Sequence, residues 1–392
     1  MHLIYKTMRI LQLHTKMVSG GIEAIVCGLA NELSKTEDVT LCTIFKPTED
    51  DDFYKKLSSF VKKDTIGKLR YGFSMKEILK IYWYIRRGKF DVVHVHGCFQ
   101  YYFLAMLFLH NQTRFFYTVH SDARMENQTW DWRLFKLKRF MFARKWVVPV
   151  TISQVSQKSF SDLYGCSSEL IFNGTPRPVL GKEQNLIKDL RLTTDTKVFF
   201  HAGRISKPKN QLVLCKVFDR LIKEGNDVVL AIAGTAEEKT IFEEISQYFS
   251  KRIVYLGERN DVPNLMAQSD AFCLPSIWEG LPVTLLESLS VGCIPICSPV
   301  GGIVNIINSG SNGLLSKDSS ENAYYDTVSR FLNMPSEEIA KMKHTASESF
   351  EKYDMKNCAR NYLEIYRYYN QKNEMSIICQ HSIVEPKNQT KK

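Results

Sequence analysis

Short apolar segments alternate with longer amphipathic ones along almost all of this 392-residue sequence. Such alternation is typical of parallel β-sheets whose strands are joined by right-handed helical crossovers. Six segments of the first half are predicted as strands: RILQLH at 9–14, VTLCTIF at 39–45, DVVHVHG at 91–97, RFFYTVH at 114–120, WVVPVTIS at 146–153 and ELIFNG at 169–174. Five follow in the second half: KVFFHAGR at 197–204, VVLAIAG at 228–234, RIVYLG at 252–257, AFCLPS at 271–276 and IPICSP at 294–299. The predicted fold class is therefore α/β.

Helical segments lie between these strands. The stretch IEAIVCGLANELSK at 22–35 repeats its apolar residues at the spacing of a helix that packs on a sheet. NQLVLCKVFDRLIKEG at 210–225 ends at a glycine, a common helix terminator. The apolar run from Phe99 to His110 is predicted as a buried helix, because it is too short to cross a bilayer.

The pattern is interrupted once. NGTPRPVLGK at 173–182 holds two prolines and two glycines, and the alternation of strands and helices then starts again. Two such series joined by a linker predict two doubly wound, Rossmann-like domains facing across a cleft. Ligands of these folds bind beyond the carboxyl ends of the strands, so that cleft is the predicted site.

The positions of the cysteines and the hydropathy of the first residues indicate the cellular compartment of the protein. The ten cysteines form no C-x-x-C pair and no cluster with histidine, so we expect neither a disulfide framework nor a zinc site. Thiols such as Cys273 and Cys297, inside apolar segments, indicate a reducing, cytoplasmic compartment. The first twenty residues resemble no secretory signal, and the strand-like MRILQLHT leaves Met1 and Met8 both open as the start.

The net charge of +10 is concentrated toward the N-terminus. Residues 1–170 hold 25 Lys and Arg against 16 Asp and Glu, or +9. The stretch RLFKLKRFMFARK at 133–145 is either a solvated basic helix or a face that binds an anionic membrane surface. Charge reversal at Lys136, Lys138 and Arg139 distinguishes the two. Nucleic acid is the weaker option, because zinc-finger spacing and RNP-like motifs are missing.

Charged residues and glycines follow several predicted strands. Gly20 and Gly21 precede a helix, where glycine lets the backbone approach an anion closely, although such a pair is more often an ordinary loop than a phosphate site. Arg204 and Lys209 form a basic loop in which a guanidinium and an ammonium would hold a diphosphate, with a solvated loop as the alternative. The acidic run at 49–52 has no His or Asn partner, so we interpret it as solvated rather than as a metal site.

The segment SIWEGLPVTLLE at 276–287 places two carboxylates eight positions apart. Pro282 suits the first turn of a helix predicted over 282–290. Glu279 then precedes the helix, and Glu287 lies inside it, about 8 Å along from Pro282 at 1.5 Å per residue. Leucines and a tryptophan flank the two acids, which disfavours two independent solvated charges. We therefore interpret them as one site for hydroxyl groups of an extended ligand whose phosphates lie near the helix N-terminus.

These motifs resemble glycosyltransferase family 4, retaining enzymes of the two-domain GT-B type. Glu279 to Glu287 has the form of the family's E-x7-E motif, in the wording EGLPVTLLE. The likeness spans most of residues 8–320 in the right order, through SGGIE at 19–23, DVVHVHG at 91–97, TVH at 118–120, TISQ at 151–154, FNG at 172–174, HAGRISKPKN at 201–210, YLGERNDVPNLMAQSDAFCLPS at 255–276 and SPVGG at 298–302.

The resemblance implies a role for each matching residue. Glu287 would accept hydrogen bonds from a ribose, and Glu279 would contact the donor sugar. Arg204 and Lys209 would neutralise the departing diphosphate, and His120 would reach the sugar from the N-terminal half. Further donor contacts are implied around Gly20, Gly21, Gly257, Leu265, Gly280, Leu281, Pro282 and Val283.

The resemblance also implies domain limits and a reaction. Residues 1–178 would form an acceptor domain and 179–355 a nucleotide-sugar domain, while 356–392 would hold a helix returning to the first domain, then a polar tail. The implied reaction moves a sugar from a nucleoside-diphosphate sugar to a glycan or lipid-linked acceptor, with retention and without a metal, as in surface-polysaccharide assembly. We expect a cytoplasmic protein, peripheral at the inner face of the plasma membrane.

The sequence departs from the family pattern at two places, and two alternative functions are considered. Gly234-Thr235-Ala236-Glu237 lacks a second glycine common in the family, which puts one nucleotide contact in doubt. Ser288 and Ser290 replace small apolar residues. One alternative is a nucleotide-sugar 2-epimerase of the same fold, although no motif supplies its acid-base groups. The other is a catalytically silent homologue that binds nucleotide sugar. Such a homologue would be expected to lack Arg204, Lys209 or Glu287, and all three are present.

Overall fold

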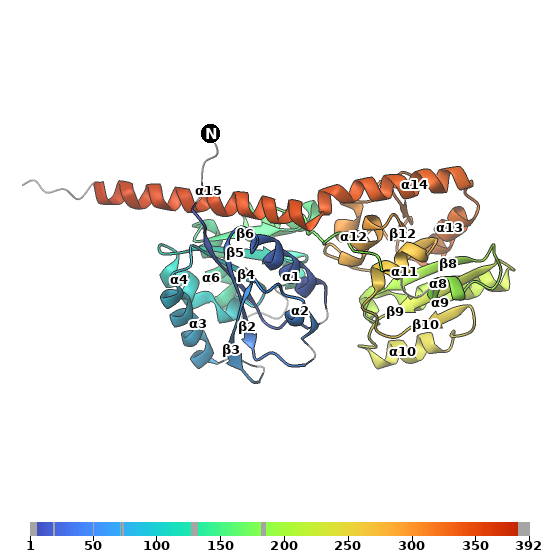
Figure 1. The fold of residues 1–392 in the computed structure, drawn as a ribbon, viewed down its shortest axis with the longest axis horizontal. Helices are drawn as coiled ribbons and strands as arrows, with labels where there is room; N and C mark the ends of the chain where they lie inside the picture. Colours follow the sequence, from blue (N-terminus) through green and yellow to red (C-terminus); the bar gives the residue numbers. More distant parts are fainter. Residues whose placement is uncertain are drawn as a thin grey trace, which may run out of the picture. The chain divides into compact units, whose positions relative to one another are not determined.

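The computed structural model describes residues 6–18, 20–49, 51–70, 72, 74–126, 132–181 and 186–382, with 372–382 described by their backbone alone. The chain divides into two compact units. The first comprises residues 1–151, 159–171 and 358–392, and the second comprises 152–158 and 172–357. Each unit is built around its own parallel sheet, which confirms the predicted α/β class (Figure 1). Among the described residues, no helix is long and apolar enough to cross a membrane.

The sheet of the first unit has the strand order β3-β2-β1-β4-β5-β6-β7, with parallel pairing throughout. Its strands are β1 (Arg9–His14), β2 (Asp38–Phe45), β3 (Lys62–Lys68), β4 (Val92–His96), β5 (Arg114–Val119), β6 (Val147–Thr151) and β7 (Glu169–Leu170). The strand order reverses between β1 and β4, the place where such sheets bind ligands.

Helices join and cover these strands. They are α1 (Gly21–Leu33), α2 (Asp52–Lys55), α3 (Met75–Gly88), η1 (Phe99–Tyr101), α4 (Phe103–Leu109), α5 (Ala123–Glu126), α6 (Trp132–Ala143) and α7 (Gln154–Tyr164). The last helix, α15 (Met355–Ser382), belongs to this unit from Cys358 onward. Its Tyr362 and Tyr366 are buried against β4 and β5.

The sheet of the second unit has the order β10-β9-β8-β11-β12-β13 and is also parallel. Its strands are β8 (Lys197–Ala202), β9 (Val228–Ala233), β10 (Ile253–Tyr255), β11 (Ala271–Leu274), β12 (Ile294–Cys297) and β13 (Leu314–Leu315). Its helices are α8 (Leu186–Asp189), η2 (Lys207–Lys209), α9 (Gln211–Lys223), α10 (Lys239–Ser246), α11 (Val262–Gln268), α12 (Val283–Ser290), η3 (Gly301–Asn305), α13 (Glu321–Leu332), α14 (Ser336–Ser349) and η4 (Phe350–Tyr353). Strand thiols such as Cys273 and Cys297 are fully buried, as predicted.

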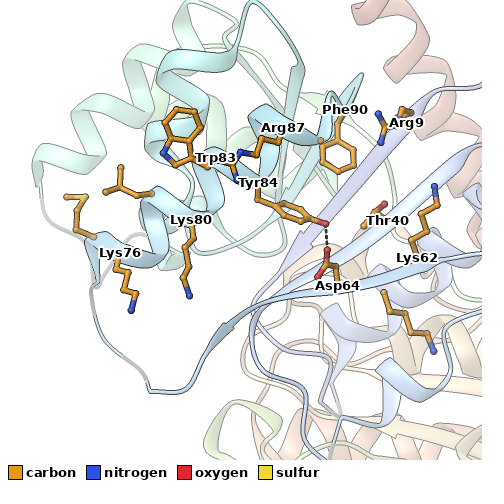
Figure 2. Close-up of a pocket in the computed structure, with 14 residues that line it drawn as sticks. Arg9, Thr40, Lys62, Asp64, Lys76, Lys80, Trp83, Tyr84, Arg87 and Phe90 are labelled. Carbon is orange, nitrogen blue, oxygen red and sulfur yellow. Dashed lines mark hydrogen bonds between the residues drawn. The ribbon is translucent and has the colours of Figure 1, made fainter.

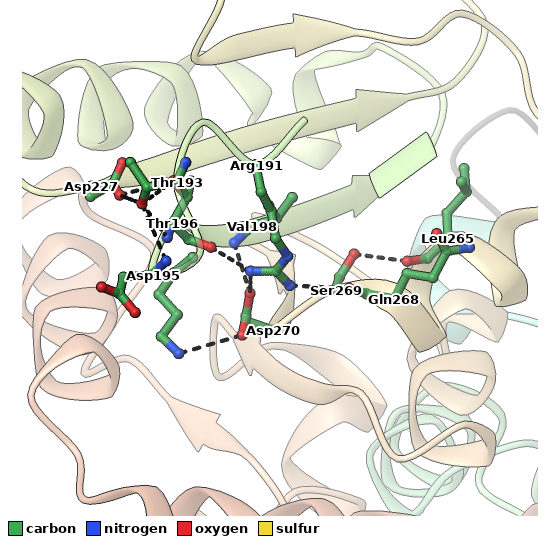
Figure 3. A network of polar contacts seen from close by, with 11 residues as sticks. Arg191, Thr193, Asp195, Thr196, Val198, Asp227, Leu265, Gln268, Ser269 and Asp270 are labelled. Carbon is green, nitrogen blue, oxygen red and sulfur yellow. Dashed lines mark hydrogen bonds and ion pairs between the residues drawn. The ribbon is translucent and has the colours of Figure 1, made fainter. Parts of the chain in front are cut away.

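A polar network ties the amino ends of the second unit's strands together (Figure 3). Asp270, just before β11, accepts a hydrogen bond from the Val198 N–H at 2.8 Å and pairs with Arg191 at 2.9 Å. Asp227, before β9, accepts hydrogen bonds from Thr193 and Thr196. The Ser-Asp pair that resembles the family at 269–270 is therefore structural here, since ligands of such sheets bind at the opposite, carboxyl ends.

Three predictions about local structure were wrong. Strand β3 was missed because its sequence, KKDTIGK, is polar at this edge of the sheet. The run from Phe99 to His110 is not one helix: η1 and α4 are separate, and Phe108 is exposed. Asp51 is buried rather than solvated, because its carboxylate accepts hydrogen bonds from the N–H groups of Met17 and Thr48.

Lys138 corrects the prediction of a solvated or membrane-facing basic helix at 133–145. Its side chain on α6 is fully buried, and its ammonium lies 3.3 Å from the Glu126 carboxylate and 4.1 Å from the centre of the Tyr117 ring. Only Lys136 and Arg139 of the three chosen residues are exposed. Reversing all three charges would therefore disrupt the core and would not test membrane binding.

Candidate active site

Most predicted ligand-binding residues of the second unit follow the carboxyl ends of its strands. Arg204 comes two residues after β8, and Lys209 ends the short helix η2. Glu279 lies in the loop between β11 and α12, and Glu287 lies on α12. Parallel neighbours β8 and β11 end at the same edge of the sheet, so these loops meet there.

A shielded ion pair joins two of these loops. Lys209 Nζ donates a hydrogen bond to Glu279 Oε1 at 2.6 Å, and Ser276 Oγ donates to the same oxygen at 2.7 Å. The Lys209 and Glu279 side chains are only 20% and 10% exposed. Charges shielded from water interact more strongly with a ligand than exposed charges do. The sequence predicted both residues for the site but not their direct contact.

Glycines hold the Glu279 loop against the segment after β12. Gly302 N–H donates to Gly280 O at 2.7 Å. Gly301 has φ of +54°, and a Cβ there would lie 1.8 Å from Glu279 O. A residue larger than glycine at 301 would therefore push away the backbone that carries Glu279. The SPVGG motif therefore has a physical role that was not predicted from the sequence.

Arg204 is placed differently from Lys209. Its side chain is 60% exposed, and its guanidinium donates a hydrogen bond to the Glu237 carboxylate at 2.9 Å. Glu237 belongs to the segment that departs from the family pattern, so the departure adds an acid beside this cation. Gly234 has φ of +149°, and a Cβ there would lie 1.9 Å from Gly203 O. The first glycine of that segment thus permits the close approach of the β8 and β9 loops.

Helix α12 begins one residue after the predicted position, with Pro282 as its N-cap. Glu287 is half-buried on this helix. Leu265 and Leu281 are 1% and 5% exposed, and their side chains pack in the core. Contacts predicted for these two residues are therefore confined to their backbones. The loop backbone at Gly257 has φ of +71° and accepts a hydrogen bond from Gly234 N–H.

A buried histidine lies beneath the Arg204 loop. His201, on β8, has its Nδ1 2.9 Å from Cys273 O, and its Nε2 lies 3.1 Å from Gln211 Nε2. Because a carbonyl only accepts, Nδ1 carries the proton and Nε2 accepts from Gln211. Gln211 also donates to Arg204 O at 2.9 Å. Burial lowers the pKa of His201 to about 4, so the ring is neutral at pH 7.

The other predicted residues, Gly20, Gly21 and His120, belong to the first unit. Gly20 caps α1, and a Cβ there would meet the Glu23 carboxylate at 2.3 Å. Glu23 in turn lies 3.3 Å from His14, the last residue of β1. His120 directly follows β5, as predicted. Ser19, the first residue of the predicted glycine motif, lies outside the described residues.

A chain of hydrogen bonds reaches His120 from helix α15. Tyr366 lies 2.6 Å from His94 Nδ1, and Gln12 Nε2 donates to the Tyr366 hydroxyl at 3.4 Å. Gln12 Oε1 lies 2.8 Å from His96 Nε2, and His96 Nδ1 lies 3.0 Å from His120 Nε2. This chain of hydrogen bonds was not predicted from the sequence, although two of its histidines stand in the DVVHVHG motif.

The amide of Gln12 fixes the proton positions along this chain. Because its oxygen only accepts, His96 carries its proton on Nε2, and His96 Nδ1 accepts from His120 Nε2–H. Burial lowers the pKa of His96 well below its ordinary value, and that of His120 to about 3, so both rings are neutral. His120 Nδ1 is then an acceptor, and it has no hydrogen-bond partner among the described residues.

Acid should destabilise the protein through these histidines. Each folded-state pKa lies below the unfolded value near 6.5, so the unfolded chain binds more protons, and stability is lost as pH falls from 6.5 toward 4. Each such ring should lower the free energy of unfolding by about 2 kcal/mol between pH 7 and 5. Urea unfolding across this range measures the slope. His201→Gln should flatten it, whereas the same change at exposed His344 should not.

Comparisons with known proteins agree with this fold. Residues 19–176 match the pattern of "Glycosyltransferase Family 4", and residues 182–349 match that of "Glycosyl transferases group 1". A glycosyltransferase from Rickettsia africae superposes with a TM-score of 0.77 over 93% of this chain and 99% of its own, at 17% identity. An Anabaena protein, HepE, crystallised with UDP and glucose, superposes with a TM-score of 0.73 over 92% of this chain and 100% of its own, at 18% identity. The fold is therefore GT-B.

Several sequence relatives also have names of glycosyltransferases. An Escherichia coli protein named "UDP-Gal:alpha-D-GlcNAc-diphosphoundecaprenol alpha-1,3-galactosyltransferase" is 27% identical over 62% of this chain and 66% of its own. A Staphylococcus aureus protein, "Capsular polysaccharide biosynthesis glycosyltransferase CapH", is 23% identical over 91% of this chain and 98% of its own. Matches to other relatives span as little as about a quarter of the relative's length. The chain belongs to glycosyltransferase family 4.

Proposed function

We propose that this protein is a retaining glycosyltransferase that moves a sugar from a nucleoside-diphosphate sugar to a lipid-linked or glycan acceptor in surface-polysaccharide assembly. The shielded Lys209–Glu279 pair carries the proposal, because it places a cation and a carboxylate suited to sugar binding together at the carboxyl-terminal edge of the second sheet. Arg204 and Glu287 lie on the adjoining loop and helix. The printed names of the E. coli and S. aureus relatives, which refer to a diphosphoundecaprenol-linked sugar and to capsular polysaccharide, support the acceptor class.

The proposed mechanism follows from where charge develops. The bond between the anomeric carbon and the diphosphate oxygen breaks, and both electrons leave with the diphosphate. Lys209, Arg204 and N–H groups at the start of α12 stabilise that negative charge. The acceptor oxygen then bonds to the anomeric carbon on the face that the diphosphate left, and its proton passes to a diphosphate oxygen. Configuration is retained, and Glu279 positions the sugar without acting as a base.

The remaining predicted residues each have a separate role in the proposal. His120 Nδ1 accepts a hydrogen bond from a hydroxyl group of the donor sugar, because the His120 ring is neutral and this nitrogen carries no proton. Glu287 binds the ribose hydroxyls. Since Lys209 and Arg204 supply positive charge for the diphosphate, we propose that the reaction needs no divalent metal. A lipid-linked acceptor lies in a membrane, so we also propose peripheral association with an anionic membrane surface.

The test is the configuration of the product. Purified protein is incubated with α-linked nucleotide sugars and a lipid-diphosphate sugar acceptor, and the new linkage is examined by NMR. An α-linkage formed equally with and without EDTA supports the proposal. A β-linkage contradicts retention, and loss of transfer in EDTA contradicts metal independence. Nucleotide binding without transfer to any acceptor tested favours a silent homologue.

A further inference from the structure

A large basic groove lies on the first unit, at the edge of its sheet that carries β3 (Figure 2). Its volume is about 1070 Å³, and it is bounded by α3 and by residues of β1, β2 and β3. Six of its lining side chains are cationic and one is acidic: Arg9, Lys62, Lys63, Lys76, Lys80 and Arg87, with Asp64. None of the proposed donor-site residues lines it.

Two of these cations are neutralised locally and four are not. Arg9 and Lys62 both pair with Asp38. The carboxylate of Asp64 accepts a hydrogen bond from Tyr84 at 2.8 Å. Among the described residues, no carboxylate lies within ion-pair distance of the other four, which are Lys63, Lys76, Lys80 and Arg87. Their charge is therefore available to an anionic partner.

Helix α3 is apolar on two faces. Ile78, Ile81 and Ile85 are buried in the core of the unit. Met75, Leu79 and Trp83, spaced four residues apart, are 46%, 45% and 48% exposed. The outer face of a helix in contact only with water is normally polar, so this exposed row needs a partner.

We propose that this groove docks on an anionic lipid bilayer. Lys76, Lys80 and Arg87 alternate with the exposed apolar row, the pattern of a helix that lies in the plane of a membrane interface. Trp83 suits that interface because its ring is both apolar and polar. The cations of β3 and α3 bind headgroup phosphates, while Met75 and Leu79 enter the acyl boundary. A soluble polyanion would use the cations but leave the apolar row exposed.

This inference deepens the membrane association that forms part of the proposed function, and it moves the membrane face from α6 to α3. The experiment is flotation of the full chain with vesicles of phosphatidylcholine alone or with phosphatidylglycerol added. We expect binding only to the anionic vesicles, weakening as salt is raised. Lys76→Glu with Lys80→Glu should lower the partition coefficient at least about thirtyfold. Trp83→Ala should lower it about tenfold.

A matched control separates this surface from general basicity. Lys136→Glu with Arg139→Glu makes the same change in net charge on exposed positions of α6, and it should alter the partition coefficient less than twofold. Equal losses in the two double variants, or no binding of the unsubstituted protein to anionic vesicles, would overturn the proposal. Binding to heparin but not to vesicles would also overturn it. The thermal stabilisation of each variant by nucleotide measures donor binding by the second unit independently of the membrane. Failure of membrane docking and failure of donor binding are therefore distinguished.

Discussion

Lys209→Met is expected to lower kcat for sugar transfer by about 10²–10³-fold while the protein stays folded. The substitution keeps most of the side chain's length and apolar stem but removes the ammonium that lies 2.6 Å from Glu279 Oε1. In the proposed mechanism that charge stabilises the departing diphosphate, so its loss acts mainly on the transition state. Steady-state rates at saturating donor measure the effect, with circular dichroism as the check on folding.

Lys223→Met is the matched control for this substitution. Lys223 pairs with Asp219 at 2.7 Å on the surface of α9, and 74% of its side chain is exposed. The control removes the same charge from the same unit and should leave kcat unchanged. Retention of kcat within threefold by Lys209→Met would contradict the role of the ammonium.

Lys138→Met is expected to lower the free energy of unfolding by about 3–5 kcal/mol, because it leaves the largely buried Glu126 carboxylate without its counterion. Lys138 Nζ and the Tyr117 hydroxyl both donate to Glu126 Oε1. Burial lowers the pKa of Lys138, while the Glu126 carboxylate opposes that shift. Urea unfolding at pH 7 measures the loss.

Two further variants interpret that result. Lys136→Met, on the same helix but exposed, should change the unfolding midpoint little. Lys138→Met combined with Glu126→Gln should recover part of the lost stability, since both charges are then removed. A loss below about 1 kcal/mol for Lys138→Met would show that the ammonium is not held by this pair.

The second unit's part of the candidate site was predictable because its chemistry is local in sequence. Arg204, Glu279 and Glu287 each stand at a fixed distance from a strand or helix whose apolar pattern is strong. Parallel strands then bring the loops together at one edge. Strand β3 lacked such a signal, because an edge strand buries little and its residues are mostly polar.

Contacts between distant parts of the chain were not predictable. Tyr366 and His94 are separated by 272 residues, and nothing in either segment specifies the other. Lys138 is one of several cations on α6, and only the position of Glu126 on another element distinguishes it from Lys136. The exposed row on α3 was likewise hidden, because the same helix shows a normal buried face.

The central claim, a nucleoside-diphosphate sugar site at the second unit's strand edge, is tested most directly by a thermal-shift screen against UDP, GDP, ADP, CMP and NAD, repeated with Glu287→Ala. A nucleotide at a hundred times its Kd should stabilise the protein by about 2.7 kcal/mol. We predict stabilisation by one nucleoside diphosphate and its loss in the variant. A folded protein that responds to none of these nucleotides, or that responds equally with Glu287 removed, would contradict the assignment.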